Sequence, residues 1–407
     1  MVHVIKTDEE AVEVARTLAR GFAEGAARRD AERILPVAEI EALSDSGLLG
    51  ITVPAEHGGA GVRTATLGAV IRELAAADGS IGQIPQNHFW YVDSIRENGT
   101  PEQREFFYRE VLAGRQLGNA AVDARAPDGS RRRARLRPGE DGGFLISGHK
   151  IYSTGALFAH WIPVIAVDDE DLHHTAFVPR DAPGLTVIDD WDGMGQRTTA
   201  SGTVLLEDVH VPADRIVAGH RTYERAGTFR SFGLLLHAAI DTGIAEGALA
   251  DAAAFLSGYT KGGWPGNELT RVVEDPVVVQ LFGELAVLTR AARALLESAG
   301  NVIDEARAAI ANTDDPEEAA RWEAEAAVAM AAARAHADTA ANRVTSEWFA
   351  LAGASASLRS HNLDRHWRNA RTHTIHDPRR AKVHDVGNFH LNGIAPARPN
   401  DPRSRRR

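Results

Sequence analysis

The sequence contains no cysteine among its 407 residues. This absence excludes disulfide bonds, thiolate metal sites and cysteine nucleophiles, and it fits a reducing compartment. No apolar run approaches the roughly 20 residues that span a bilayer, and the first twenty residues form a charged helical pattern that differs from a signal peptide. We therefore expect a cytoplasmic protein with no membrane segment.

An excess of positive charge is also missing, because 45 lysines and arginines stand against 56 aspartates and glutamates and the formal net charge is −11. This balance argues against a nucleic-acid-binding surface. Two basic runs, Arg131–Arg137 and Arg403–Arg407, are expected to be a solvated loop and a frayed terminus. A Rossmann glycine fingerprint is missing, and the glycine run at residues 58–61 lacks the spacing of a phosphate loop. The chain therefore has no recognisable site for a nicotinamide cofactor.

The hydrophobic periodicity divides the chain into three regions. Apolar residues recur at helical spacing from Asp8 to about Leu49, and again from about Thr222 onward. Between Leu117 and Val217 short alternating runs are separated by turn residues, as in a small β-barrel or sandwich. The predicted strands are Phe144–Ser147, Trp161–Val167, Thr175–Val178, Leu185–Ile188 and Thr203–Leu206. The predicted later helices are Ser231–Leu256, Pro276–Ile310, Pro316–Leu351 and one opened by Leu358.

These patterns predict an α+β fold in three domains. Residues 1–115 form a helical domain, residues 116–220 a β domain, and residues 221–395 a four-helix bundle, followed by a basic tail at 396–407. The first bundle helix is apolar apart from polar interruptions at His237 and Asp241. The alanine-rich helix Pro316–Leu351 is too apolar to be covered by one bundle, which indicates an interface between subunits.

The stretch Asp364–Pro378 carries two imidazoles, His373 and His376, in the last turn of a predicted helix that Pro378 stops. Histidine has an unperturbed pKa close to working pH, so such a pair suits proton transfer or hydrogen bonding to an oxyanion. A surface-facing helix end and a structural metal pair are plainer interpretations. Taken alone, this stretch favours the plainer interpretations.

A second polar cluster, Ile81–Tyr91, contains His88, Trp90 and Tyr91 in an apolar context. Buried amides and imidazoles need hydrogen-bond partners, so such a cluster forms an internal network or lines a pocket. The residues alone favour these two interpretations about equally.

Three motifs of the β region carry a family resemblance. They are Gly118–Ala121, Gly148–Gly155, and Met194–Thr203 followed by Glu207–Pro212. Together with the stretch Asp364–Pro378 they resemble the acyl-CoA dehydrogenase superfamily, and the resemblance extends over residues 43–396. It is closest to the flavin-dependent monooxygenase branch, which includes dibenzothiophene monooxygenase and the sulfur-acquisition oxidoreductases.

The resemblance implies a flavin site in the β region. A flavin ring needs hydrogen bonds that small hydroxyls and amides supply without blocking its faces, although strand hydroxyls often only satisfy their own turns. The loop Tyr259–Gly266 lacks the arginine with which the dehydrogenases reach the FAD pyrophosphate, so FMN is expected in place of FAD. The implied cofactor-binding residues are Asn119, Ser153, Thr154, Arg197, Lys261 and Arg368.

The resemblance also implies the roles of the catalytic residues. In the dehydrogenases the loop that matches Thr374–Pro378 holds a glutamate base, and here an imidazole replaces it. We expect His376 to donate a proton, His373 to orient the site and Ser153 to touch the flavin N5 side. The residues expected to line the substrate chamber are His88, which is also counted as catalytic, Trp90 and Tyr91.

The expected activity is that of a two-component monooxygenase that assembles as a homotetramer. It takes reduced FMN from a separate flavin reductase and, with O2, oxygenates a small organosulfur or related substrate through a flavin C4a-hydroperoxide. The main alternative is an FAD-dependent acyl-CoA dehydrogenase that draws its base, Glu246, from the first bundle helix. A scaffold without cofactor is disfavoured by the retained flavin motifs. A metal enzyme using His373, His376 and Asp377 is disfavoured because the dedicated metal motifs are missing, so no metal is expected.

Overall fold

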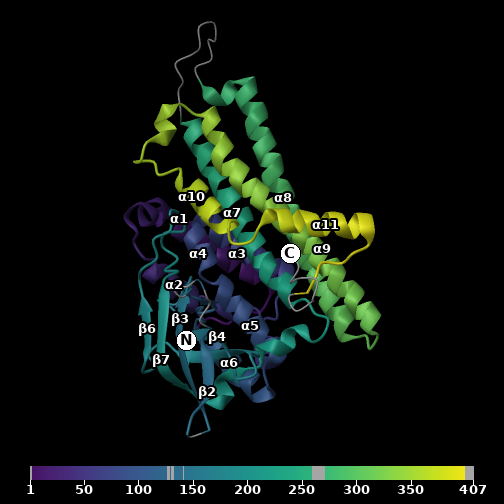
Figure 1. Cartoon of the computed structure of the whole chain (residues 1–407). Coiled ribbons are helices and arrows are strands. Elements are labelled where there is room, and N and C mark those ends of the chain that lie inside the picture. Colours follow the sequence, from purple (N-terminus) through teal and green to yellow (C-terminus); the bar gives the residue numbers. More distant parts are fainter. Residues whose placement is uncertain (1, 126–128, 130–132, 141, 259–270, 399–407) are drawn as a thin grey trace.

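A computed structural model of the chain describes residues 2–125, 129, 133–140, 142–258 and 271–398. The expected phosphate contact Lys261 lies outside the described residues, as do part of the first basic run and the whole of the second. In Figure 1 the sheet occupies the lower half, and the long helices rise from it.

The amino-terminal region is helical, as predicted. Its first helix begins where the Thr7 hydroxyl accepts a hydrogen bond from the Glu10 amide, and it buries an alanine-rich face. Thr100 and Gln103 form a complete capping box at the start of the last helix of this region. The helices are α1 (Asp8–Glu32), α2 (Val37–Asp45), α3 (Thr64–Ala77), α4 (Gly79–Gln83), α5 (Gln86–Asn98) and α6 (Pro101–Leu112), with short 3-10 turns η1 (Leu48–Gly50) and η2 (Ala55–His57).

The middle region is a mixed sheet that contains all five predicted strands. Its order is β6-β7-β3-β2-β4-β5-β8, with β1 paired to β3. Among the described residues no ladder joins β6 to β8, so the sheet is open and the closure of a barrel is not seen. The strands are β1 (Val122–Asp123), β2 (Arg135–Pro138), β3 (Phe144–Ile151), β4 (Trp161–Val167), β5 (His173–Pro179), β6 (Leu185–Ile188), β7 (Thr203–Val211) and β8 (Ile216–Val217).

Three long helices dominate the carboxy-terminal region, close to the predicted bounds. Asp275 and Asp315 each cap a helix that has proline at its start. The elements are η4 (Gly219–Tyr223), α7 (Phe229–Ser257), η5 (Val272–Glu274), α8 (Pro276–Ala311), α9 (Pro316–Glu347), η6 (Trp348–Leu351), η7 (Ala354–Ser357), α10 (Arg365–Thr374) and α11 (Arg379–Asn392).

The helix at the end of the predicted bundle differs from the prediction. It begins at Arg365 in place of Leu358, because turns and irregular backbone occupy residues 358–364. It also ends at Thr374, so His376 lies in the turn after the helix, where its amide donates to the carbonyl of His373. Pro378 disfavours helical backbone at Asp377, so the helix cannot resume through this turn.

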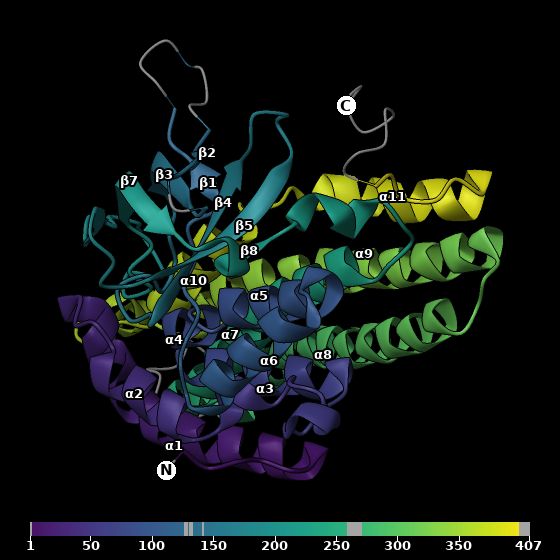
Figure 2. The ribbon, with the colours of Figure 1, turned by 90° about the horizontal axis from the view of Figure 1, so that it is seen from below.

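Helix α7 is the centre of the packing. A Cβ on Gly243 or Gly247 would lie 2.4 Å or 2.2 Å from backbone oxygens of α3, so glycine is required for this close approach. Helix α7 is long and apolar enough to cross a bilayer, but 83% of its apolar window is buried inside the protein. In Figures 1 and 2, α4 and α10 lie where the long helices meet the sheet.

Candidate active site

The loop after β3 holds a buried hydroxyl without a partner. Tyr152 and Gly155 both have left-handed backbone, with φ of 56° and 73°, and the Ser153 amide donates to the carbonyl of Gly202 at 3.0 Å. The Ser153 side chain is only 1% exposed, and its Oγ has no hydrogen-bond partner among the described residues. Because buried polar atoms are nearly always satisfied, this hydroxyl indicates a place for a bound group.

The Asn119 amide beside this loop is held rigidly. Tyr91 Oη donates to Asn119 Oδ1 at 2.8 Å, and Asn119 Nδ2 donates to the carbonyl of Tyr152 at 3.2 Å. Burial raises the pKa of Tyr91 above its ordinary value, so its hydroxyl stays a neutral donor. Tyr91 therefore positions Asn119, and its hydroxyl is used inside the protein.

Thr154 belongs to a chain of hydroxyls. Its Oγ1 lies 2.8 Å from Ser201 Oγ, which lies 2.7 Å from Thr199 Oγ1, and this last hydroxyl donates to the carbonyl of Gln196. The Gln196 amide donates to Asn369 Oδ1 at 2.6 Å. This series of hydrogen bonds links the flavin-motif loop to α10. Of the two neighbouring hydroxyls, Thr154 is therefore partnered and Ser153 is not.

Two buried imidazoles and one buried carboxylate form a hydrogen-bonded cluster in the helical region. His373 of α10 has its Nδ1 2.6 Å from Asp241 Oδ1 and its Nε2 3.0 Å from His237 Nδ1. The other oxygen of Asp241 pairs with Arg334 of α9. All four side chains are less than a tenth exposed. Asp241 therefore joins α7, α9 and α10 through charged hydrogen bonds.

The protonation of this cluster follows from its partners. A carboxylate only accepts, so Nδ1 of His373 donates to Asp241, while Nε2 of His373 and Nδ1 of His237 share one hydrogen bond. Burial alone would raise the pKa of Asp241, but Arg334 and His373 hold it below its ordinary value. Burial, followed by the charges of His376 and His373, lowers the pKa of His237 well below its ordinary value. Asp241 is thus charged and His237 neutral near pH 7.

His376 completes the cluster from the turn after α10. Its ring stacks on His237, with centroids 4.5 Å apart and planes 23° apart, while its side chain is exposed. Desolvation against its neighbours, and then the positive charges of His373 and Arg334, lower its pKa from the ordinary value. The structure therefore brings His373 and His376 together, with His237 between them.

His88 lies apart from this cluster. Its Nε2 donates to the carbonyl of Leu49 at 2.9 Å, and its Nδ1 accepts from the Leu117 amide at 3.1 Å. It has no exposed surface, and burial lowers its pKa to about 4. Both ring nitrogens thus have protein partners, and the expected catalytic and chamber role of His88 stays a prediction. Trp90 packs against Phe229, with ring centroids 4.4 Å apart, about two turns of α7 before His237.

The two remaining predicted arginines line one cavity of about 490 Å³. Arg368 is already occupied there, since it pairs with Asp30 at 2.6 Å and with Asp364 at 2.8 Å. The Arg197 guanidinium has no hydrogen-bond or ion-pair partner in the part of the chain that the structure describes, and neither has the Arg359 guanidinium beside it. Arg197 and Arg359 are thus the available cations of this cavity, and the sequence did not indicate Arg359.

Sequence reasoning missed Asp241, Arg334 and His237 as site residues. The available signal was the pair of polar interruptions, His237 and Asp241, four residues apart on one face of an apolar helix. Nothing local marked Arg334, which is 93 residues from Asp241. Among the described residues, no group of three or more histidine, aspartate or glutamate side chains is arranged to hold a metal ion.

Comparison with known proteins covers nearly the whole chain. Residues 6–115 match the family model "Acyl-CoA dehydrogenase, N-terminal domain", residues 125–209 the middle domain and residues 235–378 the C-terminal domain. The chain is 32% identical to dibenzothiophene monooxygenase of Rhodococcus erythropolis, over 96% of this chain and 95% of that protein. It is 30% identical to the probable FMNH2-dependent monooxygenase SfnC of Pseudomonas putida, over 95% and 96%. The crystal structure of FMN-bound TdsC from Paenibacillus sp. A11-2 superimposes with a TM-score of 0.86 at 30% identity, over 95% of this chain and 98% of that chain.

Proposed function

Because this chain belongs to the acyl-CoA dehydrogenase family, we propose that it is a flavin-dependent monooxygenase that uses reduced FMN and O2. Relatives with this activity match it over nearly their full length. The observation that carries the proposal is the cluster of His237, His373 and His376 on Asp241, where a dehydrogenase needs a free carboxylate.

The residues of the β region fit an FMN ring. Ser153 offers a buried hydroxyl without a partner, and Asn119 offers an amide fixed by Tyr91. Thr154 supports the same loop through its hydroxyl chain. We assign the phosphate to Arg197, whose guanidinium is unpaired among the described residues. When bound, reduced FMN supplies the electrons that activate O2.

In this proposal His376 is the proton donor and acceptor. Its lowered pKa keeps the ring neutral near pH 7, so it presents one N–H and one free nitrogen. Stacking on His237 fixes the plane of the ring. Asp241 fixes the orientation of His373, which in turn holds His237. Asp241 and His373 are therefore positioning residues, as the carboxylate of a catalytic triad is for its histidine.

In the dehydrogenase alternative the base would be Glu246, and its carboxylate is already paired. Each oxygen of the Glu246 carboxylate takes a guanidinium, one from Arg72 and the other from Arg293, the latter at 2.6 Å. Both carboxylate oxygens are therefore engaged by protein groups and not presented to a substrate. Glu246 therefore serves as a link between α3, α7 and α8.

Several finer features belong to the same proposal. The substrate is a small organosulfur or related compound, since relatives are named for dibenzothiophene, and a separate reductase supplies the reduced flavin. The domains are 1–115, 116–220, 221–395 and the tail 396–407, with α10 as the fourth bundle helix and the sheet as an incomplete barrel. The cysteine-free composition supports a cytoplasmic location.

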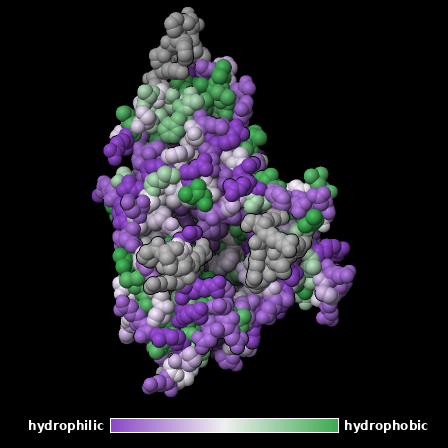
Figure 3. Space-filling model, in the orientation of Figure 1, coloured by the Kyte–Doolittle hydropathy of each residue, from purple (hydrophilic) through white to green (hydrophobic). Residues whose placement is uncertain are grey.

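A homotetramer is also part of the proposal. Val277, Val279, Leu281 and Val287 near the start of α8 are 63%, 56%, 40% and 69% exposed. Figure 3 shows hydrophobic residues gathered at this end of the molecule. An exposed apolar patch of this kind favours contact between subunits.

The function is tested by mixing the protein anaerobically with chemically reduced FMN and then admitting O2 with dibenzothiophene or a smaller thioether. We expect an oxygenated sulfur product in proportion to O2 consumed, with much less product from reduced FAD. A second arm adds butyryl-CoA to the protein with oxidised flavin. Bleaching of the flavin in that arm, with no sulfur product in the first, would establish the dehydrogenase instead.

A further inference from the structure

A second pocket, which we call the Arg96–Arg307 pocket, lies apart from the site residues named above. It has a volume of about 350 Å³, within the range of roughly 300–1,000 Å³ typical of small-molecule sites. The segment Thr52–Val62, the start of α3, and residues of α5, α7 and α8 enclose it. None of its lining residues is a candidate for the flavin or imidazole site.

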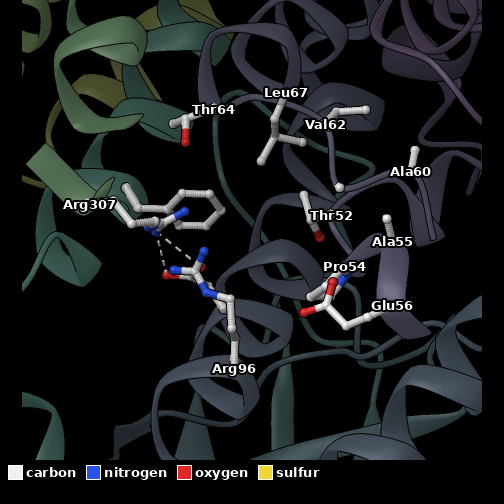
Figure 4. Close-up of a pocket in the computed structure, with 13 residues that line it drawn as sticks. Thr52, Pro54, Ala55, Glu56, Ala60, Val62, Thr64, Leu67, Arg96 and Arg307 are labelled. Carbon is white, nitrogen blue, oxygen red and sulfur yellow. Dashed lines mark hydrogen bonds and ion pairs between the residues drawn. The ribbon is translucent and has the colours of Figure 1, made fainter. Parts of the chain in front are cut away.

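One wall of the pocket presents guanidinium groups. Arg96 and Arg307 share the buried carboxylate of Asp93, at 2.6 Å and 3.2 Å. Arg307 Nε also donates to Thr228, at 3.2 Å. Nη1 of both arginines and Nε of Arg96 have no partner among the described residues. Figure 4 shows the two guanidinium groups side by side in the pocket. They are therefore preorganised to bind an anion.

An unpartnered hydroxyl faces this wall. Thr52 Oγ1 is shielded from solvent and has no hydrogen-bond partner among the described residues, and Figure 4 shows it directed into the pocket. The buried Tyr108 hydroxyl, also unpartnered, lies within electrostatic reach of Arg96, Asp93 and Glu56. Burial raises the pKa of Tyr108 to about 12, so it stays a donor. The Thr52 hydroxyl and the unpartnered N–H groups of the two arginines call for an acceptor between them.

The other residues that line the pocket limit the charge and shape of the ligand that supplies this acceptor. Glu56 has no ion-pair partner among the described residues and points into the pocket opposite Arg96. Asp93 and Glu97 already pair with the two arginines, Glu97 with Arg96 at 2.9 Å, and Glu56 adds a third carboxylate, which disfavours a ligand with two negative charges. Val62, Leu67 and Phe232 add an apolar side.

We propose that the Arg96–Arg307 pocket binds a small organic monoanion. Its carboxylate or sulfonate head accepts hydrogen bonds from Arg96, Arg307 and Thr52, and its short apolar body lies against Leu67, Val62 and Phe232.

Calorimetric titration of the full-length protein with butanoate and with butanesulfonate tests the proposal. We expect saturable binding with a Kd at or below about 1 mM. Thr52→Val is expected to weaken it about tenfold, because it removes one hydrogen bond to a charged group. The variant keeps the shape of the side chain and deletes a hydroxyl that has no protein partner, so folding is preserved. Arg96→Gln is expected to weaken binding at least as much, because it removes a charged hydrogen-bond donor. Arg307 should stay in place, since its ion pair with Asp93 is retained.

Thr186→Val, at an exposed position of β6, is the matched control and should bind like the unmodified protein. No saturable binding, or binding unchanged in both pocket variants, would overturn the proposal. Inorganic sulfate or butylammonium binding as tightly as butanoate would also overturn it, because the monoanion and its apolar body would then not be recognised.

Discussion

Replacing Asp241 by asparagine is expected to lower the free energy of unfolding, because a single buried charge is lost. The carboxylate has no exposed surface and is hydrogen-bonded to both Arg334 and His373. Asparagine keeps the size of the side chain, so the packing of α7 is preserved. The charge that neutralises Arg334 disappears, and one of the two acceptors becomes an amide donor.

The magnitude follows from the burial of the partner. Arg334 is 2% exposed, and its Nε and Nη2 already lack partners among the described residues. Removing one member of a buried ion pair costs about 3–5 kcal/mol, because the other charge is left uncompensated. We expect a loss of this size in the free energy of unfolding of Asp241→Asn near pH 7.

Asp251→Asn is the matched control. Asp251 also bonds one arginine and one histidine, Arg365 and His366, but its side chain is 38% exposed. Water screens this ion pair, so its removal should cost no more than about 1 kcal/mol.

Urea unfolding of the two variants and the unmodified protein, followed by circular dichroism, measures the difference. Equal losses in both variants, or a loss below about 1 kcal/mol in Asp241→Asn, would refute the argument that burial of Arg334 makes Asp241 essential. Asp241→Asn should also reduce the yield of oxygenated product at unchanged FMN affinity, since His237 and His373 lose their orientation.

Four other outcomes are expected. His376→Ala should still bind FMN but release hydrogen peroxide in place of product, with product formation lower by about 10²–10⁴, and His373→Ala should show a milder loss; full coupling in His376→Ala would contradict the role of this donor. Calorimetry should give tighter binding of reduced FMN than of FAD, and equal affinities would count against the assignment. The unfolding free energy should fall by about 3 kcal/mol between pH 6.5 and 4. The reason is that the pKa of His88 is lowered to about 4 in the folded protein, so this histidine is protonated first in the unfolded chain. His88→Gln should lose this part of the pH dependence, and an unchanged slope would mean that His88 is not the group. Sedimentation should show a tetramer at micromolar concentration, and a stable monomer would contradict the proposed assembly.

Much of the fold follows from the sequence alone, because hydrophobic periodicity and capping residues act locally. Strands Trp161–Val167 and Leu185–Ile188 have the predicted bounds, and the helix predicted from Pro276 begins there. The last helix was misplaced, since proline and turn effects around residues 358–378 compete with the periodicity. The motif at Gly148–Gly155 also led to Ser153, whose unpartnered hydroxyl only the packed structure reveals.

The partners of the polar side chains were decided by the tertiary structure. His88 had the sequence context of a pocket residue, yet Leu49 and Leu117, from different segments, take both of its ring nitrogens. Arg334 and Asp241 meet across 93 residues of intervening sequence. A polar residue in an apolar segment signals that a partner is required, but the identity of that partner depends on which distant segments pack together. The sequence by itself thus determined the elements and the flavin motifs, while only packing decided which partners each histidine has.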